Sequence, residues 1–347
     1  PVPGNARTTV IAVGTTSPLA ITPLLVTNPS TPVGAGNARL QVTHAAAGVV
    51  PVYLAVTSPG FPIDQAEYLG PLAFEESTDS AGIEVPAGNY QVRVLVGTPN
   101  PSFSDNDVVF DSGSIPLPEG ADIHAVAVNS MVPSQADPNG SPISVVLLDG
   151  TGSIDLFDVN TGANLRVVHN FKPAPAVDVI VDVVDTMADE NLKIVTNLSF
   201  GEATPFLAPP VAPVAYDVSV VLNSDNTQEA LNFTADLMAG MSYTAIADNP
   251  NGAGTIREWV TVDDIRRVAT EAKLRVLHGS PAAGTVDVYV IPDAANEVPA
   301  EREPTLPSFA LGTDTGYLPI APGVYDIYVT LEGDDGIVIP VTDPVSY

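Results

Sequence analysis

The sequence predicts an all-β protein built of tandem immunoglobulin-like antiparallel β-sandwiches, with three repeat equivalents. Three observations predict this class. The 347 residues include 27 Gly and 34 Pro, which separate many short segments. Within those segments apolar and polar residues alternate, as they do in strands with one buried face. One arrangement of such segments also occurs three times along the chain, which indicates a tandem array.

The repeated arrangement is a strand that ends in His, a turn of small residues and Pro, and a second alternating strand. Its three copies lie at 38–56, 164–182 and 273–291. The histidines that end the first strands are His44, His169 and His278. A tyrosine follows each histidine after 46 or 47 residues, at the start of another strand. These tyrosines are Tyr90, Tyr216 and Tyr325. The near-constant spacing indicates that the three copies share one fold.

Both markers are expected to have structural roles. Each histidine shares a strand face with apolar residues, as His169 does with Leu165 and Val167. We therefore expect it to cap the core and to hydrogen-bond a backbone group rather than to bind a metal. Each tyrosine follows a turn that contains Pro and is similar to the tyrosine corner of immunoglobulin-like sandwiches. There the ring covers the sandwich edge and the hydroxyl bonds a carbonyl.

The two ends of the sequence are expected to complement each other. Residues 1–13 align without a gap on 116–128, where a repeat ends. The first residues are therefore predicted to be the final two strands of a repeat, and the third repeat is predicted to lack those strands. The predicted segments are 1–37 (joining segment), 38–150 (first repeat), 151–263 (second repeat) and 264–347 (third repeat, incomplete at its C-terminal end).

Three arrangements would complete the third repeat. In the main one, chains join head to tail, and each N-terminal strand pair completes the third sandwich of its neighbour by β-strand complementation. Alternatively, the sequence is a segment of a longer covalent array, or its N-terminal strands fold back onto its own third repeat. The residues expected to make the joint are Thr8, Thr9, Val10, Ile11, Ala12, Val13, Ile21, Leu24, Leu25, Ile337, Val338, Ile339, Val341, Val345 and Tyr347.

The repeat motifs resemble a known family. The third repeat reads LRVLHGSPAAGTVDVYV and then APGVYDIYV, and the second reads LRVVHNFKPAPAVDVIV. These motifs resemble the bacterial domain-of-unknown-function family 4397, over essentially the whole chain. The resemblance implies tandem β-sandwich modules of exported and surface proteins, and it implies no activity. The first repeat departs from the pattern, since we assign Pro51 to the position that holds Asp178 and Asp287 in the others.

The composition excludes several classes of partner and site. Asp and Glu number 41 against 12 Lys and Arg, for a formal charge of −29 at pH 7. Such a surface repels nucleic-acid phosphates and anionic lipids, so we expect neither as a partner. The chain has no Cys, which excludes disulfides, thiolate metal sites and a cysteine nucleophile. No apolar stretch approaches 18 residues, so no membrane span is expected.

One loop is a candidate calcium site. It contains Asp105, Asp107 and Asp111 at a spacing that partly resembles calcium-binding loops, but it lacks the Gly and the distal Glu of an EF-hand. The corresponding positions of the other repeats are polar turns, which favours a hairpin tip. Calcium is the one cofactor candidate, and none other is expected. No catalytic motif is present, so we expect no enzyme.

These observations predict a structural subunit of an extracellular filament or cell-surface stalk, whose partners are copies of itself. The alternative is an adhesin, an array of modules on the bacterial surface that binds a glycan or a protein receptor. Both predict a location outside the cell or on the bacterial cell surface.

Overall fold

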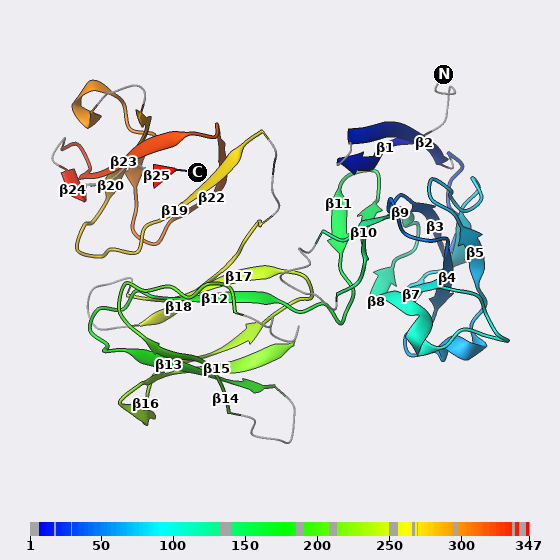
Figure 1. Ribbon diagram of the computed structural model, residues 1–347, viewed down its shortest axis with the longest axis horizontal. Coiled ribbons are helices and arrows are strands. Elements are labelled where there is room, and N and C mark those ends of the chain that lie inside the picture. The colour runs from blue at the N-terminus through cyan, green and yellow to red at the C-terminus, as the bar shows by residue number, and fades with distance from the viewer. Residues whose placement is uncertain are drawn as a thin grey trace. The chain divides into compact units, whose positions relative to one another are not determined.

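A computed structural model describes the chain as a series of short strands (Figure 1). The described residues are 7–16, 19–28, 30–131, 140–184, 191–207, 214–249, 256–265, 268, 270–293, 298–334, 337–339 and 345–346. Short 3-10 turns occur at Ile63–Gln65, Asp105–Asp107 and Pro299–Glu301. The prediction of an all-β fold of sandwiches is confirmed.

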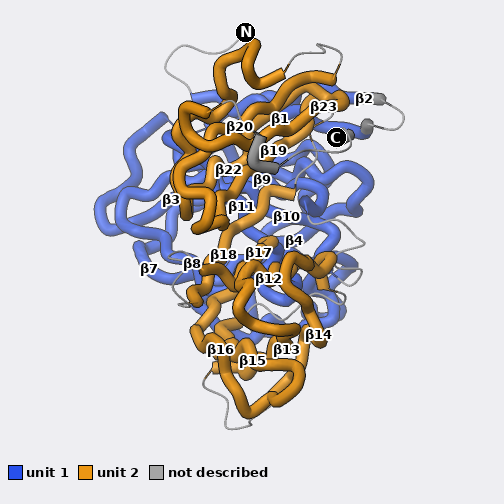
Figure 2. Tube along the Cα trace, turned by 90° about the vertical axis from the view of Figure 1, so that its left-hand side faces the viewer, with its two compact units in different colours: residues 1–163, 208–213, 238–240 blue, residues 164–207, 214–237, 241–347 orange. Residues whose placement is uncertain are grey.

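The chain divides into two compact units, coloured separately in Figure 2. Unit 1 comprises residues 1–163 with 208–213 and 238–240, and unit 2 comprises 164–207, 214–237 and 241–347. Each unit is described by itself below.

Unit 1 contains one sandwich and a separate hairpin. The hairpin pairs β1 (Arg7–Thr16) with β2 (Leu19–Asn28). The sandwich has one sheet in the order β11-β10-β9-β3-β6 and another in the order β5-β4-β7-β8. Their bounds are β3 (Asn37–His44), β4 (Val52–Thr57), β5 (Leu69–Leu72), β6 (Ile83–Pro86), β7 (Gly88–Val96), β8 (Val108–Leu117), β9 (Asp122–Asn129), β10 (Ile143–Leu148) and β11 (Ser153–Leu156).

The core of this first sandwich lies between its two sheets. Alternate residues of β3, such as Leu40 and Val42, meet residues of the opposite sheet, such as Leu54 and Phe110. Phe110 is fully buried. Burial of each such side chain stabilises the fold by roughly 1.5–3 kcal/mol. The alternating pattern in the sequence therefore marks the residues that hold the two sheets together.

Unit 2 contains two sandwiches. The second sandwich has sheets in the orders β12-β17-β18 and β14-β13-β15-β16. Its bounds are β12 (Asn164–His169), β13 (Val177–Val183), β14 (Leu192–Leu198), β15 (Ala215–Leu222), β16 (Asp225–Asp236), β17 (Ser242–Asp248) and β18 (Arg257–Val262). Its sheets bury alternate residues of β13 and β15, such as Val179 and Val220.

The third sandwich has a two-stranded sheet, β19-β22, and a larger sheet in the order β21-β20-β23-β24, with β25 also paired to β23. Their bounds are β19 (Ala272–Leu277), β20 (Val286–Pro292), β21 (Leu306–Phe309), β22 (Asp314–Ile320), β23 (Val324–Leu331), β24 (Ile337–Ile339) and β25 (Val345–Ser346). Val286, Val288 and Ile291 are buried residues of β20.

Not every strand pair is antiparallel as predicted. The first strand of each of the first two sandwiches runs parallel to a much later strand, β3 to β9 and β12 to β17. Two parallel strands must be joined by a long crossover connection. Here the connecting chain includes the strands of the opposite sheet. Alternation of apolar residues is the same in both orientations, so the sequence pattern could not distinguish them.

Two details of the predicted repeats differ in the structure. The boundary predicted at residue 150 falls inside a hairpin, because β11 pairs with β10 and extends the first sandwich to Leu156. The register of β4 on β7 also shows that Tyr53 occupies the position of Asp178 and Asp287, so the assignment of Pro51 to that position was wrong. An apolar cluster that includes Phe103 packs around Tyr53, where the other sandwiches have a buried carboxylate.

Within the described ranges, no helix has the length and apolar character needed to cross a membrane.

Candidate functional site

The hairpin of β1 and β2 was predicted to make the joint, and its two faces differ. Val10 pairs with Leu25 across the hairpin, and Ile11 pairs with Leu24. Because side chains alternate along a strand, these pairs divide the hairpin into two faces. We call the face with Ile11 the covered face and the face with Val10 the open face. Gly14 has a φ of +125°, and a Cβ there would lie 1.8 Å from the Ala20 carbonyl oxygen, so only glycine fits.

The covered face packs on the first sandwich. Val13 of the hairpin forms a buried cluster with Ala45 and Val126, and Ile11 and Leu24 pack against it. This cluster lies on the outer side of the β10-β9-β3 sheet, since the side chains that alternate with Val126 belong to the sandwich core. The sheet is therefore apolar on both sides, and the hairpin covers the side that faces away from the core.

The open face is apolar and exposed. Val10, Ile21 and Leu25 are 63%, 51% and 53% exposed, and Ala12 and Pro23 beside them are also exposed. Large apolar side chains grouped on one sheet face mark a surface that another element covers.

The alignment of 1–13 on 116–128 shows what the open face corresponds to. It places Val10 on Ala125 and Ala12 on Ala127. Both alanines belong to the core of the first sandwich. The open face of the hairpin is therefore equivalent to the core face of β9, but its large side chains are exposed where those of β9 are buried.

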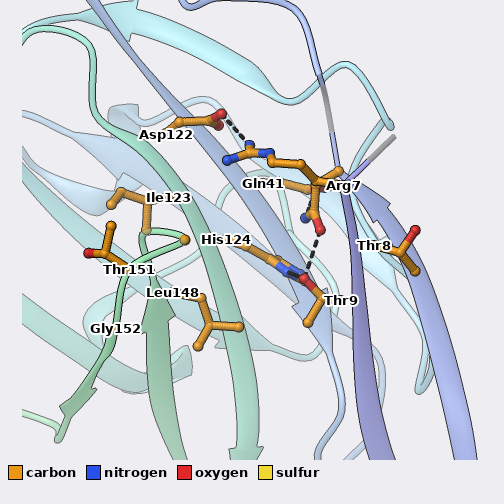
Figure 3. Close-up of a pocket in the computed structure, with 12 residues that line it drawn as sticks. Arg7, Thr8, Thr9, Gln41, Asp122, Ile123, His124, Leu148, Thr151 and Gly152 are labelled. Atoms are coloured by element: carbon orange, nitrogen blue, oxygen red, sulfur yellow. Dashed lines mark hydrogen bonds and ion pairs between the residues drawn. The ribbon is translucent and has the colours of Figure 1, made fainter. Parts of the chain in front are cut away.

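A pocket of about 360 Å³, lined mainly by residues with polar side chains, lies where the hairpin meets the sandwich (Figure 3). Arg7 of β1 forms an ion pair with Asp122 at the start of β9. The same carboxylate accepts two hydrogen bonds from Arg39, from Nε at 2.9 Å and from Nη2 at 2.6 Å. Arg39 is only 1% exposed, so Asp122 compensates a buried cation and also holds the hairpin by its first strand.

His124 connects the hairpin to the sandwich at the same place. Its Nδ1 lies 3.0 Å from Thr9 Oγ1 of the hairpin, and its Nε2 lies 2.7 Å from Thr43 Oγ1 of β3. Burial, together with the positive charge of Arg7, lowers the pKa of His124 to about 4. The imidazole is therefore neutral at pH 7.

This burial predicts that unit 1 loses stability in mild acid. Above pH 6.5 His124 is neutral in both the folded and unfolded states. Between pH 6.5 and 4 only the unfolded state takes up the proton, so the free energy of unfolding falls by up to about 3 kcal/mol. The apparent pKa is measured from the histidine C–H resonances in an NMR titration, with His124→Gln to assign the signal and to flatten the pH dependence. A measured pKa near 6.5 would contradict this expectation.

The end of the hairpin makes a chain of hydrogen bonds with the first sandwich. Thr9 Oγ1 donates to Asn28 Oδ1 at 2.7 Å, and Asn28 Nδ2 donates to Gln41 Oε1 at 2.7 Å. Gln41 Nε2 donates in turn to the carbonyl oxygen of Thr27 at 3.2 Å. Gln41 lies on β3, three residues before His44.

The second and third sandwiches, both in unit 2, meet through the same arrangement. Thr244 Oγ1 donates to the carboxylate of Asp263, which follows β18. Arg275 Nη1 donates to Asp263 Oδ1 at 3.0 Å and to the Val262 carbonyl oxygen at 2.9 Å. Arg275 lies on β19, three residues before His278. Thr9, Asn28 and Gln41 therefore correspond to Thr244, Asp263 and Arg275.

Asp263 accepts further bonds in this junction. Tyr317 Oη donates to Oδ1 at 3.1 Å and Arg166 Nη2 donates to Oδ2 at 3.3 Å. The carboxylate is 1% exposed. At the other end of β17, Asn170 Nδ2 donates to the Gly279 carbonyl oxygen at 2.8 Å, and a Cβ on Gly279 would lie 2.5 Å from that nitrogen. The glycine permits this close approach, so the junction is held at two points.

The three sandwiches differ at one edge. In the first, β3 has β6 on one side and β9 on the other, and in the second, β12 has β17 as its parallel neighbour. In the third, β19 pairs with β22, and no other described strand pairs with it. Among the described strands, the edge that takes a parallel neighbour in the first two sandwiches is therefore unpaired in the third.

The C-terminal residues predicted for the joint lie on the other sheet. Ile337, Val338 and Ile339 form β24, and Val345 lies in β25, and both strands pair with β23. Val341 and Tyr347 lie outside the described residues. The structure brings the N-terminal joining residues together in the hairpin. It does not place the C-terminal ones on the strand that corresponds to β3 and β12, because that strand is β19.

The repeat histidines make the backbone contact expected of them. Nε2 of each lies near the carbonyl oxygen six residues later, at 3.3 Å for His44, 3.1 Å for His169 and 2.5 Å for His278. Nδ1 of each accepts from the N–H two residues later. Each histidine thereby fixes the turn between the first two strands of its sandwich.

The repeat tyrosines make the contact of a tyrosine corner in the two sandwiches where it is described. Tyr90 Oη donates to the Pro86 carbonyl oxygen at 2.8 Å, and Tyr325 Oη donates to that of Ala321 at 2.7 Å. Tyr216 is buried in the second sandwich.

The three aspartates of the candidate calcium loop do not converge. Asp107 accepts from the backbone N–H and the hydroxyl of Ser104, both at 2.8 Å, and these bonds lower its pKa. Asp111 accepts from Gln91 and from the Gly113 N–H. In the part of the chain that is described, no group of three or more His, Asp or Glu side chains has a metal-binding arrangement. Calcium stays a prediction.

The junction residues were missed by the sequence reasoning. Asn28, Gln41, Asp263 and Arg275 carry no motif, and their roles depend on strands that meet only in the folded chain. One feature of the sequence could have indicated the junctions. A polar residue lies three positions before each repeat histidine, on the strand that the histidine ends. Arg166 is the third member of that set.

Comparison with known families agrees with the resemblance seen in the sequence. Residues 163–289 match the family described as "Domain of unknown function (DUF4397)". The match covers about a third of the chain. The matched residues span the second sandwich and continue through β19 into β20. The matched residues therefore include the Asp263–Arg275 junction between two sandwiches.

Comparison with solved structures finds weak likenesses. One is described as a "putative cell adhesion protein" from Bacteroides eggerthii DSM 20697, at 9% identity and a TM-score of 0.20, with 67% of this chain and 97% of that chain covered. Another, described in the same words, is BF2867 from Bacteroides fragilis NCTC 9343, at 11% identity and a TM-score of 0.16, with 68% and 99% covered. Scores this low carry no argument about function. No curated protein matches the sequence.

Proposed function

We propose that the chain is a non-enzymatic structural element of an extended array of β-sandwiches outside the cell. In this array the β1–β2 hairpin adds to the edge of β19 with which no described strand pairs. The observation that carries the proposal is the repeated junction. Asn28 of the hairpin bonds Gln41 of the first sandwich as Asp263 bonds Arg275 of the third, and Thr9 and Thr244 donate to Asn28 and Asp263 in the same way.

The β17–β18 pair serves two sandwiches at once. One face buries Tyr243 and Ala247 in the second sandwich. On the other face Thr244 donates to Asp263, which accepts from Arg275 of the third sandwich. The β1–β2 hairpin makes the same contact with the next sandwich, through Asn28 and Gln41. Its open face, in contrast, leaves Val10 and Leu25 exposed. Burial of each large apolar side chain of the open face in a completed sandwich would stabilise the assembly by roughly 1.5–3 kcal/mol.

Such an array would carry load through its strands. Main-chain hydrogen bonds of an added strand, together with buried apolar faces, join one sandwich to the next. The formal charge of −29 keeps the array soluble and disfavours nucleic acid as a ligand. The family likeness to modules of exported proteins supports a location at the cell surface or beyond it.

The test compares assembly of the intact chain with that of a hairpin variant. Val10→Asp/Leu25→Asp places charges on the open face, and both positions are more than half exposed, so each unit is expected to fold normally. Ile154→Asp is the matched control, because Ile154 is 62% exposed on β11 of the same unit. We expect the intact chain and the control to form oligomers as concentration rises in light scattering and electron microscopy. The hairpin variant is expected to remain monomeric.

Other outcomes discriminate between the alternatives. Equal assembly by the hairpin variant would show that the open face is not the joint. A monomeric intact chain in which the open face is protected from hydrogen exchange would indicate closure within one chain. A monomer with an unprotected hairpin that binds glycans on an array would favour the adhesin.

A further inference from the structure

We infer that the hairpin adds to a second copy of this chain in one register, with β1 parallel to β19 and Ala12 opposite His278. This inference rests on the proposed function and specifies its joint. The two complete sandwiches supply the rule, because each places an alanine of the parallel neighbour opposite the repeat histidine. The pairs are His44 with Ala127 and His169 with Ala247.

Two independent correspondences lead to the same alanine in the hairpin. The alignment of 1–13 on 116–128 places Ala12 on Ala127. The junction contacts equate Thr9 with Thr244, and three residues further along each strand this equates Ala12 with Ala247. The agreement matters because a register slip of one residue would turn the open face away from the core.

The register fits the chemistry of both edges. The bond between His278 Nε2 and the Gly284 carbonyl oxygen fixes the position of the imidazole ring. Because the ring cannot move aside, the residue opposite it must be small, and Ala12 is small. Val10 comes opposite Val276, on the side of β19 that faces the core of the third sandwich.

The same register also brings Arg7 opposite Lys273. Each of these cations already has a carboxylate partner, Asp122 for Arg7 and Asp264 for Lys273. These partners offset the repulsion between the two cations.

The orientation of the hairpin in this register also matches that of β17–β18 at the junction of unit 2. When β1 lies beside β19, the open face closes the third sandwich of one copy, and the covered face stays on the first sandwich of its own chain. The hairpin then belongs to two sandwiches, as β17–β18 does within unit 2.

Cysteine cross-linking tests the register directly, since the natural chain has no Cys. A Val10→Cys chain is mixed with a Val276→Cys chain under mild oxidation. In the inferred register the two Cα atoms lie within the range of about 4.4–6.8 Å that a disulfide spans. Val10→Cys with Leu274→Cys is the matched control, on the same face but two residues out of register. Leu25→Cys with Val276→Cys tests the second strand of the hairpin.

We expect covalent dimers from the Val10–Val276 mixture, at least tenfold above both controls on a non-reducing gel. Preferential cross-linking of Val10→Cys to Leu274→Cys would overturn the register while the assembly itself still forms. Cross-linking of Leu25→Cys to Val276→Cys would place β2 rather than β1 at the edge. Absence of assembly in light scattering would instead overturn the proposed function. The two failures are therefore distinguishable.

Discussion

Replacing Asp263 by Ala is expected to lower the free energy of unfolding of unit 2 by about 3–5 kcal/mol. The carboxylate is 1% exposed and accepts from Thr244, Arg275, Tyr317 and Arg166. Its loss leaves Arg275 without this partner in a junction where Arg275 is mostly buried. Urea unfolding followed by Trp fluorescence measures the effect, since the chain has a single Trp, on β18.

The junction of unit 1 supplies the control for this prediction. It uses Asn28 and Gln41 where unit 2 uses Asp263 and Arg275. The double variant Asp263→Asn/Arg275→Gln recreates that neutral pair and is expected to be more stable than either single variant by at least 1 kcal/mol, a coupling typical of contacting residues. Additive effects of the two single changes would contradict the equivalence of the two junctions.

Replacing Asp178 by Ala is expected to destabilise the second sandwich by about 3 kcal/mol, because three hydrogen bonds to a fully buried carboxylate are lost. The carboxylate accepts from Lys193 Nζ at 2.5 Å, the Asn197 N–H at 2.8 Å and Asn223 Nδ2 at 2.8 Å. Burial alone would raise the pKa of Asp178, but these bonds outweigh it and lower the pKa to about 2. Trp fluorescence during urea unfolding again provides the measurement.

The pKa also predicts the pH dependence of this contribution. The stabilisation is fully present above about pH 4, where Asp178 is ionised in both states, and it is lost as pH falls through 2. Lys193→Met is the control, with an expected loss of about 1 kcal/mol or less, because the Lys193 side chain is 35% exposed and partly exposed ion pairs contribute little. An Asp178→Ala variant that unfolds at the wild-type urea concentration would show that the carboxylate has no structural role.

The markers that could be predicted are those with a local cause. Each repeat histidine contacts a carbonyl six residues away, and Tyr90 and Tyr325 contact carbonyls four residues back. Contacts that close within one turn leave a signal of fixed spacing in the sequence. In the candidate calcium loop, a local contact is likewise made, because Asp107 accepts from Ser104 in the turn in which it lies.

The junctions had no comparable signal. Thr9, Asn28 and Gln41 lie on three different strands, and His124 is more than 100 residues from Thr9. A polar residue on an apolar strand is equally compatible with solvent or with a buried partner. Only the folded chain shows which of the two it has.

The sequence by itself determined the strand periodicity, the threefold repeat and the equivalence of residues 1–13 with 116–128, since all of these are properties of the chain read in order. Only the tertiary structure decided that β3 and β12 have parallel neighbours, that the hairpin has one covered and one open apolar face, and that no described strand occupies the equivalent edge of β19. The physical reason is that strand orientation, face and edge depend on which segments meet across about 80 residues of intervening chain. Alternation of apolar residues is identical for every such choice.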